Sequence, residues 1–533
     1  MRLHGRGDET PALGRAPRWM ALVATSIVLG AAIGTISPTP IGVFWDDGVY
    51  LVSAKALATG AGYRFAHLPG APPAVHFPPG WPALLALVWT IRPTFPENVA
   101  WLKLVNPLLL GAAAWLGCRL GVRRFGLAAG TSAAATVLFA TALPVLVIAG
   151  VLFSEPLFLA GLFVCLSLAE AARERGGWPL AVGAGAAAGG LILVRTAGLA
   201  LLPALVLALV LARRRRDALV SVAAAVAVLA PWQVWLSVHA DQLAVPLRGS
   251  YGPYLAWVLA LYRARSPMFV FTVMRENLLS LMRSAGVIFF PLGFPPGVAA
   301  LRPLLVMMLV VLFVFGAARA WRKAPVAVLF ALAYTPIFLA WPYAPERFVW
   351  AVWPLAGLFL AAGATECWRL GEARPRARGV RASALLAVSV ACVACAGHAA
   401  YTTRGLVRHW WDVAQRRNAA ALIPVAEWVN ANTRPDDVVA CDGESLVHLY
   451  TGRTVVPVHI LSPDEYFAGT PLEQAAADLR ALFLANRPAY AVFSAAATEL
   501  AAAPLLDGAG GSPRLDRLAQ LPGGGAAYRV VLP

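Results

Sequence analysis

Charge is scarce in this sequence. Lys, Arg, Asp and Glu together make up 13% of its 533 residues, whereas 59% are hydrophobic. This balance excludes an ordinary water-soluble domain, which carries about twice that share of charged residues. Repeated apolar runs of about 20 residues, each long enough to cross about 30 Å of hydrocarbon, predict a membrane protein with many helical spans.

Cysteines and metal-ligand motifs are scarce as well. The six cysteines are scattered. Cys392 and Cys395 form a C-x-x-C inside an apolar run with no second pair, and Cys441 is alone in the C-terminal part. We therefore predict no disulfide in the C-terminal part and no zinc or redox site at Cys392 and Cys395. No acidic cluster calls for a metal ion, so we expect no metal and no cofactor.

Acidic residues are outnumbered, and the net charge is +17. About half of the 44 Lys and Arg fall in six short clusters between apolar runs, before Trp19 and at 119–124, 173–175, 213–216, 319–323 and 369–381. Basic clusters between spans are typical of loops on the cytoplasmic side, so topology explains the basicity and no nucleic-acid partner is expected. The N-terminus lacks a convincing signal-peptide cleavage site, which predicts a cytoplasmic tail (1–18) and a retained first span.

Alternating basic clusters and apolar runs predicts eleven spans. With the N-terminus inside, the C-terminus lies outside, and the first outer loop covers residues 37–98. Residues 269–297 are apolar but contain Arg275, Glu276 and Arg283 and several prolines, so we interpret them as interfacial or re-entrant. The predicted spans are 19–36, 99–117, 125–143, 147–169, 178–195, 197–212, 218–237, 301–318, 325–341, 348–365 and 382–399.

The first outer loop begins with two adjacent acids, Asp46 and Asp47. Residues 48–59 after them predict a short helix that ends at Gly60 and Gly62. Its apolar side is expected to lie on the bilayer surface. That side comprises Tyr50, Leu51, Ala54 and Leu57. A proline-rich stretch from Pro69 to Pro82 then returns the chain to the membrane.

Composition changes near residue 401, and the last part of the chain has no span-length apolar run. It predicts a small α/β domain, covering residues 401–533, on the outer side. Within it we see no Gly-rich phosphate loop and no His/Cys cluster. The expected helices are 413–432 and 472–485, and the expected strands are 438–441, 454–459, 489–493 and 528–532.

Charges at the edge of a membrane are costly and are candidates for function. The predicted topology brings eight ionisable residues to the outer face, from distant parts of the chain. Acids beside bases there are suited to a phosphorylated lipid and a nucleophile, because a carboxylate orients or deprotonates an acceptor while guanidinium groups hold the phosphate. The eight are Asp46, Asp47, His76, Lys103, Glu155, Arg195, Glu346 and Arg347.

Structural roles remain open for the same residues. Asp46 and Asp47 are also suited to capping the following helix. Lys103 and Arg195 are also placed to extend toward the interface from the ends of spans, and Arg347 to anchor one. Glu155 is equally suited to a hydrogen bond within the bundle, and His76 to an ordinary loop. The aromatic residues of WPYAPERFVW (341–350) are more typical of a membrane-interface belt than of a substrate platform.

These motifs, in this order and on one side, resemble the GT-C glycosyltransferases. Within them the sequence resembles glycosyltransferase family 39, which includes the protein O-mannosyltransferases and the lipid A aminoarabinose transferase. The resemblance covers most of residues 19–365. The motifs are Asp46-Asp47-Gly48-Val49-Tyr50, Thr59-Gly60, Pro78-Pro79-Gly80-Trp81-Pro82, Ser154-Glu155-Pro156 and Pro345-Glu346-Arg347-Phe348.

The resemblance implies a polytopic GT-C-like membrane domain (19–400) that transfers a sugar from a polyprenyl phosphate, with inversion, to a glycan, lipid or protein acceptor outside the cytoplasm. It places the main catalytic acid at Asp46, with Asp47 beside it, and implies that Arg347 binds the lipid phosphate. His76-Phe77 stand where the aminoarabinose branch has Glu-Lys. That difference leaves Lys103 or Arg195 to replace the missing lysine. Tyr50, Glu155 and Glu346 complete the expected substrate site, and no metal is implied.

Together these inferences predict a multi-pass protein of a bacterial inner membrane, with a cytoplasmic N-terminus and a periplasmic C-terminal domain. Two other functions remain open. A transporter or flippase also needs charges among many spans, although it usually has them near the midplane and often shows internal repeats. A surface-polysaccharide polymerase or ligase would use the same kind of lipid-linked donor.

Overall fold

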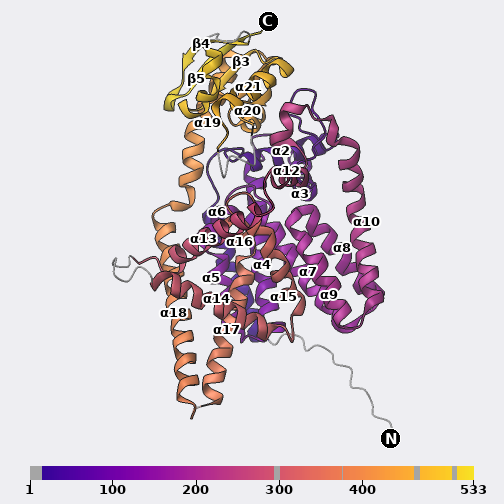
Figure 1. Ribbon diagram of the computed structural model, residues 1–533, viewed down its shortest axis with the longest axis vertical. Coiled ribbons are helices and arrows are strands. Elements are labelled where there is room, and N and C mark those ends of the chain that lie inside the picture. Colours follow the sequence, from indigo (N-terminus) through magenta and orange to yellow (C-terminus); the bar gives the residue numbers. More distant parts are fainter. Residues whose placement is uncertain (1–14, 293–300, 375, 461–468, 507–512, 533) are drawn as a thin grey trace.

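The computed structural model describes residues 15–292, 301–374, 376–460, 469–506 and 513–532. It consists of a large helical bundle with a small α/β domain at one end, as Figure 1 shows. Most of the predicted N-terminal tail (1–18) and the end of the predicted interfacial segment (269–297) lie outside the described residues.

Every predicted span contains a helix of the bundle. In the described part of the chain, six helices are long and apolar enough to cross a membrane, or seven if a bent pair counts as one span. The chain is therefore a multi-pass membrane protein. The six are α1 (Arg15–Gly34), α4 (Val99–Arg123), α7 (Glu155–Arg175), α10 (Arg215–His239), α14 (Leu301–Ala320) and α18 (Arg378–Val407).

Helices outside this set of six occupy the other predicted spans. The bent pair is α5 (Ala129–Ala140) and α6 (Leu143–Ala149), which meet at 64°. Pro144, which follows the predicted span 125–143 and would begin a tight turn to the next span, lies instead in helix α6, where it is tolerated because it stands in the first helical turn. The remaining predicted spans contain α8 (Trp178–Val194), α9 (Leu201–Leu211), α15 (Pro325–Leu339) and α17 (Trp353–Ala373).

Small residues allow the bundle helices to pack closely. Gly316 of α14 faces the carbonyl of Phe359 on α17, and Gly363 of α17 faces the carbonyl of Leu312 on α14. A methyl group at either glycine would overlap the opposite backbone. Close helix contact in this part of the bundle therefore depends on glycine on both sides.

The first outer loop folds into two helices, α2 (Trp45–Ala58) and α3 (Gly80–Ile91), which pack against each other. Tyr50, Leu51 and Ala54 of α2 are buried inside the protein. The expectation that this side of the helix lies on the bilayer surface is therefore wrong. Its apolar residues pack against α3 and the C-terminal domain instead.

The long segment between α10 and α14 is mostly helical. It contains the 3-10 turns η2 (Ala240–Gln242) and η3 (Val245–Leu247), then α11 (Arg248–Tyr251) and α12 (Tyr254–Arg263). The segment predicted as interfacial or re-entrant forms one continuous helix, α13 (Phe269–Phe289), which packs against α14, α15 and α18. Other connections are the 3-10 turn η1 (Thr196–Ala200) and the short helix α16 (Glu346–Ala351).

The C-terminal domain is built on a five-stranded sheet with strand order β2-β1-β3-β5-β4. Strand β1 pairs in parallel with β2 and β3, whereas β5 pairs antiparallel with β3 and β4. The strands are β1 (Val438–Cys441), β2 (Thr454–Pro457), β3 (Tyr490–Phe493), β4 (Arg514–Gln520) and β5 (Ala526–Val531). Four of them lie where strands are predicted. Strand β4, whose sequence RLDRLAQ is largely polar, was not predicted.

Helices surround this sheet and join it to the bundle. Helix α18 continues past the predicted boundary at residue 400, and the 3-10 turn η5 (Trp410–Asp412) links it to α19 (Val413–Asn432). Helix α20 of the domain packs on α2 of the first outer loop. The other helical elements are α20 (Glu444–Thr451), α21 (Leu472–Asn486), α22 (Ala496–Glu499), η7 (Leu500–Ala502), α23 (Ala503–Leu506) and η8 (Pro522–Gly524).

Candidate active site

The start of helix α2 separates the two adjacent acids. Asp47 is buried, and its carboxylate oxygens accept hydrogen bonds from the backbone N–H of Gly42 (2.8 Å) and of Phe44 (3.0 Å). Burial raises the pKa of Asp47 to about 7 even though these backbone hydrogen bonds act to lower it. Asp47 therefore holds the turn that starts the helix. Asp46, one residue and about 100° earlier on the helix, faces a cavity instead.

Arg347, in the first turn of α16, makes the central contacts of this cavity. Its Nη1 lies 2.5 Å from Oδ2 of Asp46, and its Nε donates a hydrogen bond to Glu155. The guanidinium also stacks on the ring of Phe153, with its central carbon 3.8 Å from the ring centroid. The outer loop, α16 and the start of α7 thus meet at one side chain.

Glu155 forms ion pairs with both arginines of the site. This residue is the first of α7, and its side chain is 2% exposed. Its Oε1 lies 2.8 Å from Nη1 of Arg195, which follows the end of α8 and also donates to Oγ of Ser154 at 3.0 Å. Asp46, Arg347, Glu155 and Arg195 therefore form a continuous chain of alternating charges, in which each buried charge has a partner of opposite sign.

The cavity beside this chain of charges has a volume of about 250 Å³. Five of the predicted site residues line it, namely Asp46, Tyr50, His76, Arg195 and Arg347. Glu155 is not among the lining residues and contacts the cavity through the two arginines that it binds. The sequence analysis therefore identified the charged part of the cavity, together with Tyr50 and His76.

His76 has its protonation fixed by its surroundings. Its Nδ1 lies 2.7 Å from the carbonyl oxygen of Gly252, so this nitrogen carries the proton and donates. Burial lowers the pKa of His76 to about 4, which keeps the ring neutral at pH 7. Its Nε2 is consequently a hydrogen-bond acceptor, suited to a hydroxyl group and not to a phosphate.

Besides Asp47 and Glu155, two further predicted residues do not line this cavity. Nζ of Lys103 donates to the carbonyls of Ser37, at 2.7 Å, and of Thr39, and so holds the chain where it leaves α1. Glu346 precedes Arg347 but turns the other way, and its Oε1 accepts hydrogen bonds from Ser280 (2.5 Å) and Ser284 (3.1 Å) of α13. Of the replacements considered for the missing lysine, only Arg195 lines the cavity.

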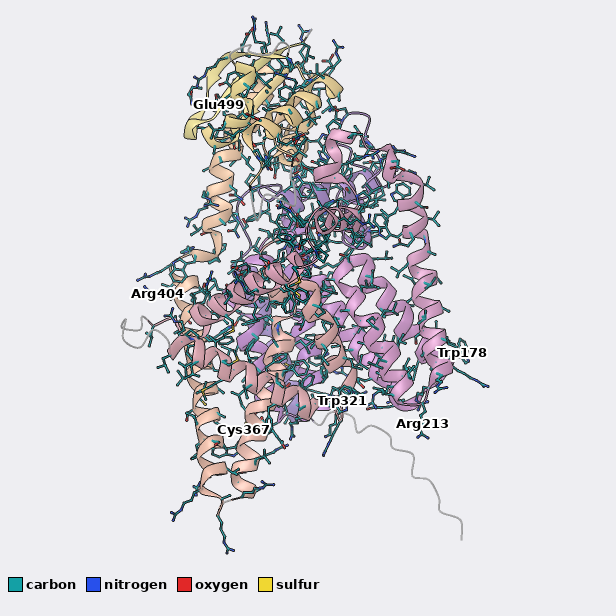
Figure 2. All side chains as sticks on the ribbon, in the orientation of Figure 1. Trp178, Arg213, Trp321, Cys367, Arg404 and Glu499 are labelled. Carbon is teal, nitrogen blue, oxygen red and sulfur yellow. The ribbon has the colours of Figure 1, made fainter. Side chains whose placement is uncertain are left out.

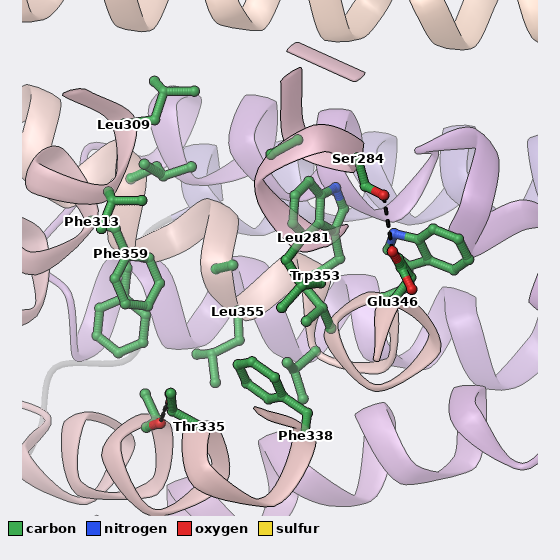
Figure 3. Close-up of a pocket in the computed structure, with 18 of the residues that line it drawn as sticks. Leu281, Ser284, Leu309, Phe313, Thr335, Phe338, Glu346, Trp353, Leu355 and Phe359 are labelled. Carbon is green, nitrogen blue, oxygen red and sulfur yellow. Dashed lines mark hydrogen bonds between the residues drawn. The ribbon is translucent and has the colours of Figure 1, made fainter. Parts of the chain in front are cut away.

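Glu346 belongs to a second, apolar cavity of about 310 Å³ on the other side of α16. Figure 3 shows its aliphatic and aromatic wall, including Leu281, Phe338, Trp353 and Phe359, with Glu346 and Ser284 at one end. Its walls come from α13, α14, α15, α16 and α17. The apolar cavity and the charged cavity thus share the short helix α16.

Aromatic residues of the charged cavity were not predicted as site residues. Trp45, Tyr254, Trp341, Tyr343 and Phe348 line it. The last three come from the segment interpreted as a membrane-interface belt, and the structure places them at the wall of this cavity. The signal that was available is the combination of aromatic residues with Pro345-Glu346-Arg347 in one short loop.

The C-terminal domain contacts the cavity wall through Trp45. The indole Nε1 of Trp45 donates to Oε1 of Glu444 in α20 at 2.8 Å, and the hydroxyl of Tyr251 donates to the same oxygen at 2.5 Å. The Tyr251 hydroxyl is in turn 2.9 Å from Nε2 of His67. Burial raises the pKa of Glu444. This network of hydrogen bonds attaches Trp45, the residue next to Asp46, to the C-terminal domain.

Among the described residues, no group of three or more His, Cys, Asp or Glu side chains is arranged to hold a metal ion. In the candidate site, the guanidinium of Arg347 stands between Asp46 and Glu155. The guanidinium group of Arg347 therefore supplies the positive charge between these two carboxylates.

This arrangement of bundle helices, outer-loop helices and a C-terminal domain is a fold that this chain shares with solved structures of other proteins. No family model matches the chain, and no curated protein matches it significantly. Solved structures do. The crystal structure of ArnT from Cupriavidus metallidurans bound to undecaprenyl phosphate has a TM-score of 0.55 at 15% identity, over 96% of this chain and 97% of that one.

Two further structures share the fold. Apo ArnT from the same organism has a TM-score of 0.55 at 17% identity, covering 97% of this chain and 98% of that chain. The archaeal oligosaccharyltransferase AglB from Archaeoglobus fulgidus, in complex with an inhibitory peptide and a dolichol-phosphate, has a TM-score of 0.54 at 13% identity. That match covers 92% of this chain and 71% of AglB. The resemblance inferred from the sequence motifs is thereby confirmed at the level of the fold.

Proposed function

We propose that this protein is an inverting glycosyltransferase that takes a sugar from a polyprenyl phosphate and transfers it to a glycan, lipid or protein acceptor. The structures of ArnT and AglB with bound undecaprenyl phosphate and dolichol-phosphate support this class of donor. The proposal includes a bacterial inner membrane, a cytoplasmic N-terminus and a periplasmic C-terminal domain, in keeping with the basic clusters of the sequence.

One observation carries the proposal: Arg347 lies between Asp46 and Glu155 at the wall of the charged cavity. Arg195 stands behind it on the same glutamate. A phosphate that enters the cavity meets two guanidinium groups, which bind phosphate oxygens in pairs of hydrogen bonds. When Arg347 turns toward that phosphate, Asp46 loses its partner and is free to bind the acceptor.

The reaction then proceeds by one displacement. The acceptor hydroxyl or amine attacks the anomeric carbon from the face opposite the phosphate, while the bond between that carbon and the phosphate oxygen breaks. The bonding electrons leave with the polyprenyl phosphate, whose added negative charge Arg347 and Arg195 stabilise. Asp46 orients the acceptor and takes its proton. Neutral His76 and Tyr50 are placed to hydrogen-bond the sugar, and no metal takes part in the proposed steps.

The apolar cavity accounts for the lipid part of the donor. It shares α16 with the charged cavity, since Val349 and Trp350 line one and Arg347 and Phe348 line the other. An isoprenoid chain needs an apolar surface that begins close to the phosphate site. We assign the apolar cavity to the first isoprene units and the charged cavity to the phosphate and sugar.

The direct test is sugar transfer by the purified, detergent-solubilised protein, using radiolabelled sugars on polyprenyl phosphate as donors. Transfer is expected for wild type and a loss of at least 100-fold for Asp46→Asn, because the amide cannot take the proton. Asp436→Asn, which changes an exposed acid of the C-terminal domain, is the matched control and should keep full activity. Undiminished transfer by Asp46→Asn would remove Asp46 from the mechanism, and failure with every lipid-linked sugar would contradict the proposed donor class.

A further inference from the structure

A third cavity, of about 370 Å³, lies at the end of the bundle remote from the C-terminal domain. It is formed by Arg124 directly after α4, by the end of α14 and the short basic turn that follows it, and by Glu366 of α17. Figure 2 places Trp321 of that turn at the lower end of the molecule, whereas Glu499 of the C-terminal domain lies at the upper end. We call this space the basic cavity.

The residues that line the basic cavity carry more positive than negative charge. Four cations line it, Arg124, Arg319, Arg322 and Lys323, against the single carboxylate of Glu366. Arg319 pairs with Glu366, and Arg124 pairs with Glu174 outside the lining at 2.5 Å. Within the described part of the chain, the side chains of Arg322 and Lys323 form no hydrogen bond or ion pair. Two positive charges at the cavity are therefore available to an anion.

The preference of basic loops for the cytoplasmic side does not by itself explain why basic residues surround a cavity. The cluster Arg213–Arg216, between α9 and α10, also lies at this end of the bundle, where Figure 2 labels Arg213. Arg213, Arg215 and Arg216 are exposed, as are Arg322 and Lys323, but the first three line none of the three cavities described above. That cluster fits the ordinary role of basic loops in setting orientation. At residues 319–323, by contrast, the basic residues line the basic cavity.

An apolar surface leads to the basic cavity. Helix α14 exposes large hydrophobic residues on one face, at the helical spacing of Leu304, Met307, Val311, Val314 and Phe315. Phe315 is both the last residue of this exposed face and part of the cavity wall. A ligand with a negative headgroup and apolar chains would bury its headgroup among the cations while its chains follow α14 in the bilayer. A free phosphate would make no use of that face.

We propose that the basic cavity binds the phosphate headgroup of an anionic phospholipid, whose acyl chains lie along the exposed face of α14. Basic pockets among helix ends on the cytoplasmic side of a membrane are suited to such headgroups, because each nearby Lys or Arg attracts the negatively charged phosphate. This site is separate from the charged cavity and does not depend on the proposed glycosyltransferase activity.

The test uses the delipidated full-length protein in detergent, with phosphatidylglycerol, phosphatidylcholine and inorganic phosphate as three separate probes. Binding is measured by native mass spectrometry and by the rise in unfolding temperature. Wild type should bind phosphatidylglycerol at least fivefold more tightly than either other probe. Arg322→Gln/Lys323→Gln should lose this preference, whereas Arg215→Gln/Arg216→Gln, which removes the same charge at the same end, should keep it.

Two outcomes would overturn the proposal. One is equal loss or equal retention of phosphatidylglycerol in the two double variants. The other is binding of inorganic phosphate or phosphatidylcholine as tight as that of phosphatidylglycerol, because the ligand would then be a free anion or any phospholipid. If the cavity variant unfolds without lipid, Glu366→Gln serves instead. It removes the only carboxylate among the lining residues and should tighten phosphatidylglycerol binding, so unchanged or weaker binding would also contradict the proposal.

Discussion

The charged cavity and the apolar cavity lie on the two sides of α16, and they handle their ionisable residues in different ways. In the charged cavity, Arg347 and Arg195 share the buried Glu155, and Arg347 also reaches Asp46 at the cavity wall. In the apolar cavity, the carboxylate of Glu346 has no ion-pair partner among the residues that the structure describes, and it is held by two serine hydroxyls.

This difference determines whether a ligand can replace the existing partners of the ionisable residues in each cavity. An ion pair with one partner at a cavity wall can be opened by a competing anion, because the phosphate replaces the lost carboxylate. The serine hydroxyls of α13 give Glu346 a fixed, internal set of bonds that no apolar ligand replaces. Under the proposed function, Arg347 takes part in the reaction whereas the neighbouring Glu346 serves packing, so substitutions at the two positions should have unequal effects.

The largest effect is expected from Arg347→Gln compared with Glu346→Gln. Losing Arg347 removes the cation closest to the proposed leaving phosphate, and transfer should fall by about 10³-fold, or about 4 kcal/mol. Glu346→Gln keeps an oxygen that accepts from the serines, so its kcat/KM should stay within about threefold of wild type. Rates are measured with saturating acceptor and a range of donor concentrations. Equal losses in the two variants would contradict the separation of the cavities.

Glu155→Gln is expected to lower stability. A neutral amide leaves the charges of Arg195 and Arg347 without their common, buried partner, and breaking a buried ion pair from one side costs about 3 kcal/mol. The apparent unfolding temperature in detergent, followed by intrinsic fluorescence, measures the loss. Asp46→Asn is the comparison, because the Asp46 side chain is 21% exposed and has Arg347 as its ion-pair partner. A Glu155→Gln variant as stable as Asp46→Asn would show that Glu155 is not the anchor of both arginines.

Sequence reasoning located most of the charged cavity because two simple rules apply to it. Apolar length predicts spans, and the side of the basic loops predicts which span ends share a face. Glu155, Arg195 and Arg347 come from three such ends, and the structure brings them into contact. The helices of the C-terminal domain, 413–432 above all, follow from their apolar periodicity in the same way.

The direction of individual side chains depends on backbone turns that these rules do not describe. Asp47 faces inward because α2 begins at Trp45, three residues before the predicted start, and the turn at Gly42 offers its N–H groups. Lys103 meets the carbonyls after α1, which no periodicity relates to α4. Strand β4 was not predicted because an edge strand with polar residues lacks the apolar alternation on which strand prediction relies.

A pH-dependent loss of stability is expected from His76 in the wall of the charged cavity. Its pKa is about 4 in the folded protein and near 6.5 in the unfolded chain, so only the unfolded chain gains a proton as the pH falls below 6.5. Folding stability should therefore decrease toward acid, by about 2 kcal/mol at pH 5 from this residue. His76→Gln should show a smaller drop in unfolding temperature between pH 7 and pH 5 than wild type. His409→Gln, at an exposed position, should reproduce the wild-type drop, and so would His76→Gln if His76 were not protected from protonation.

The smallest effect is expected from the C-terminal domain, through Glu444. Glu444→Leu removes the acceptor for the indole of Trp45 and the hydroxyl of Tyr251, so Trp45 is no longer held beside Asp46. We expect kcat to fall about tenfold, or about 1.4 kcal/mol, with little change in KM for the donor, because the arginines that bind phosphate are untouched. Glu444→Gln keeps an acceptor oxygen and should restore most of the rate. If Glu444→Gln and Glu444→Leu were equally impaired, or if the loss lay in donor KM, the network would not position Trp45 for the reaction.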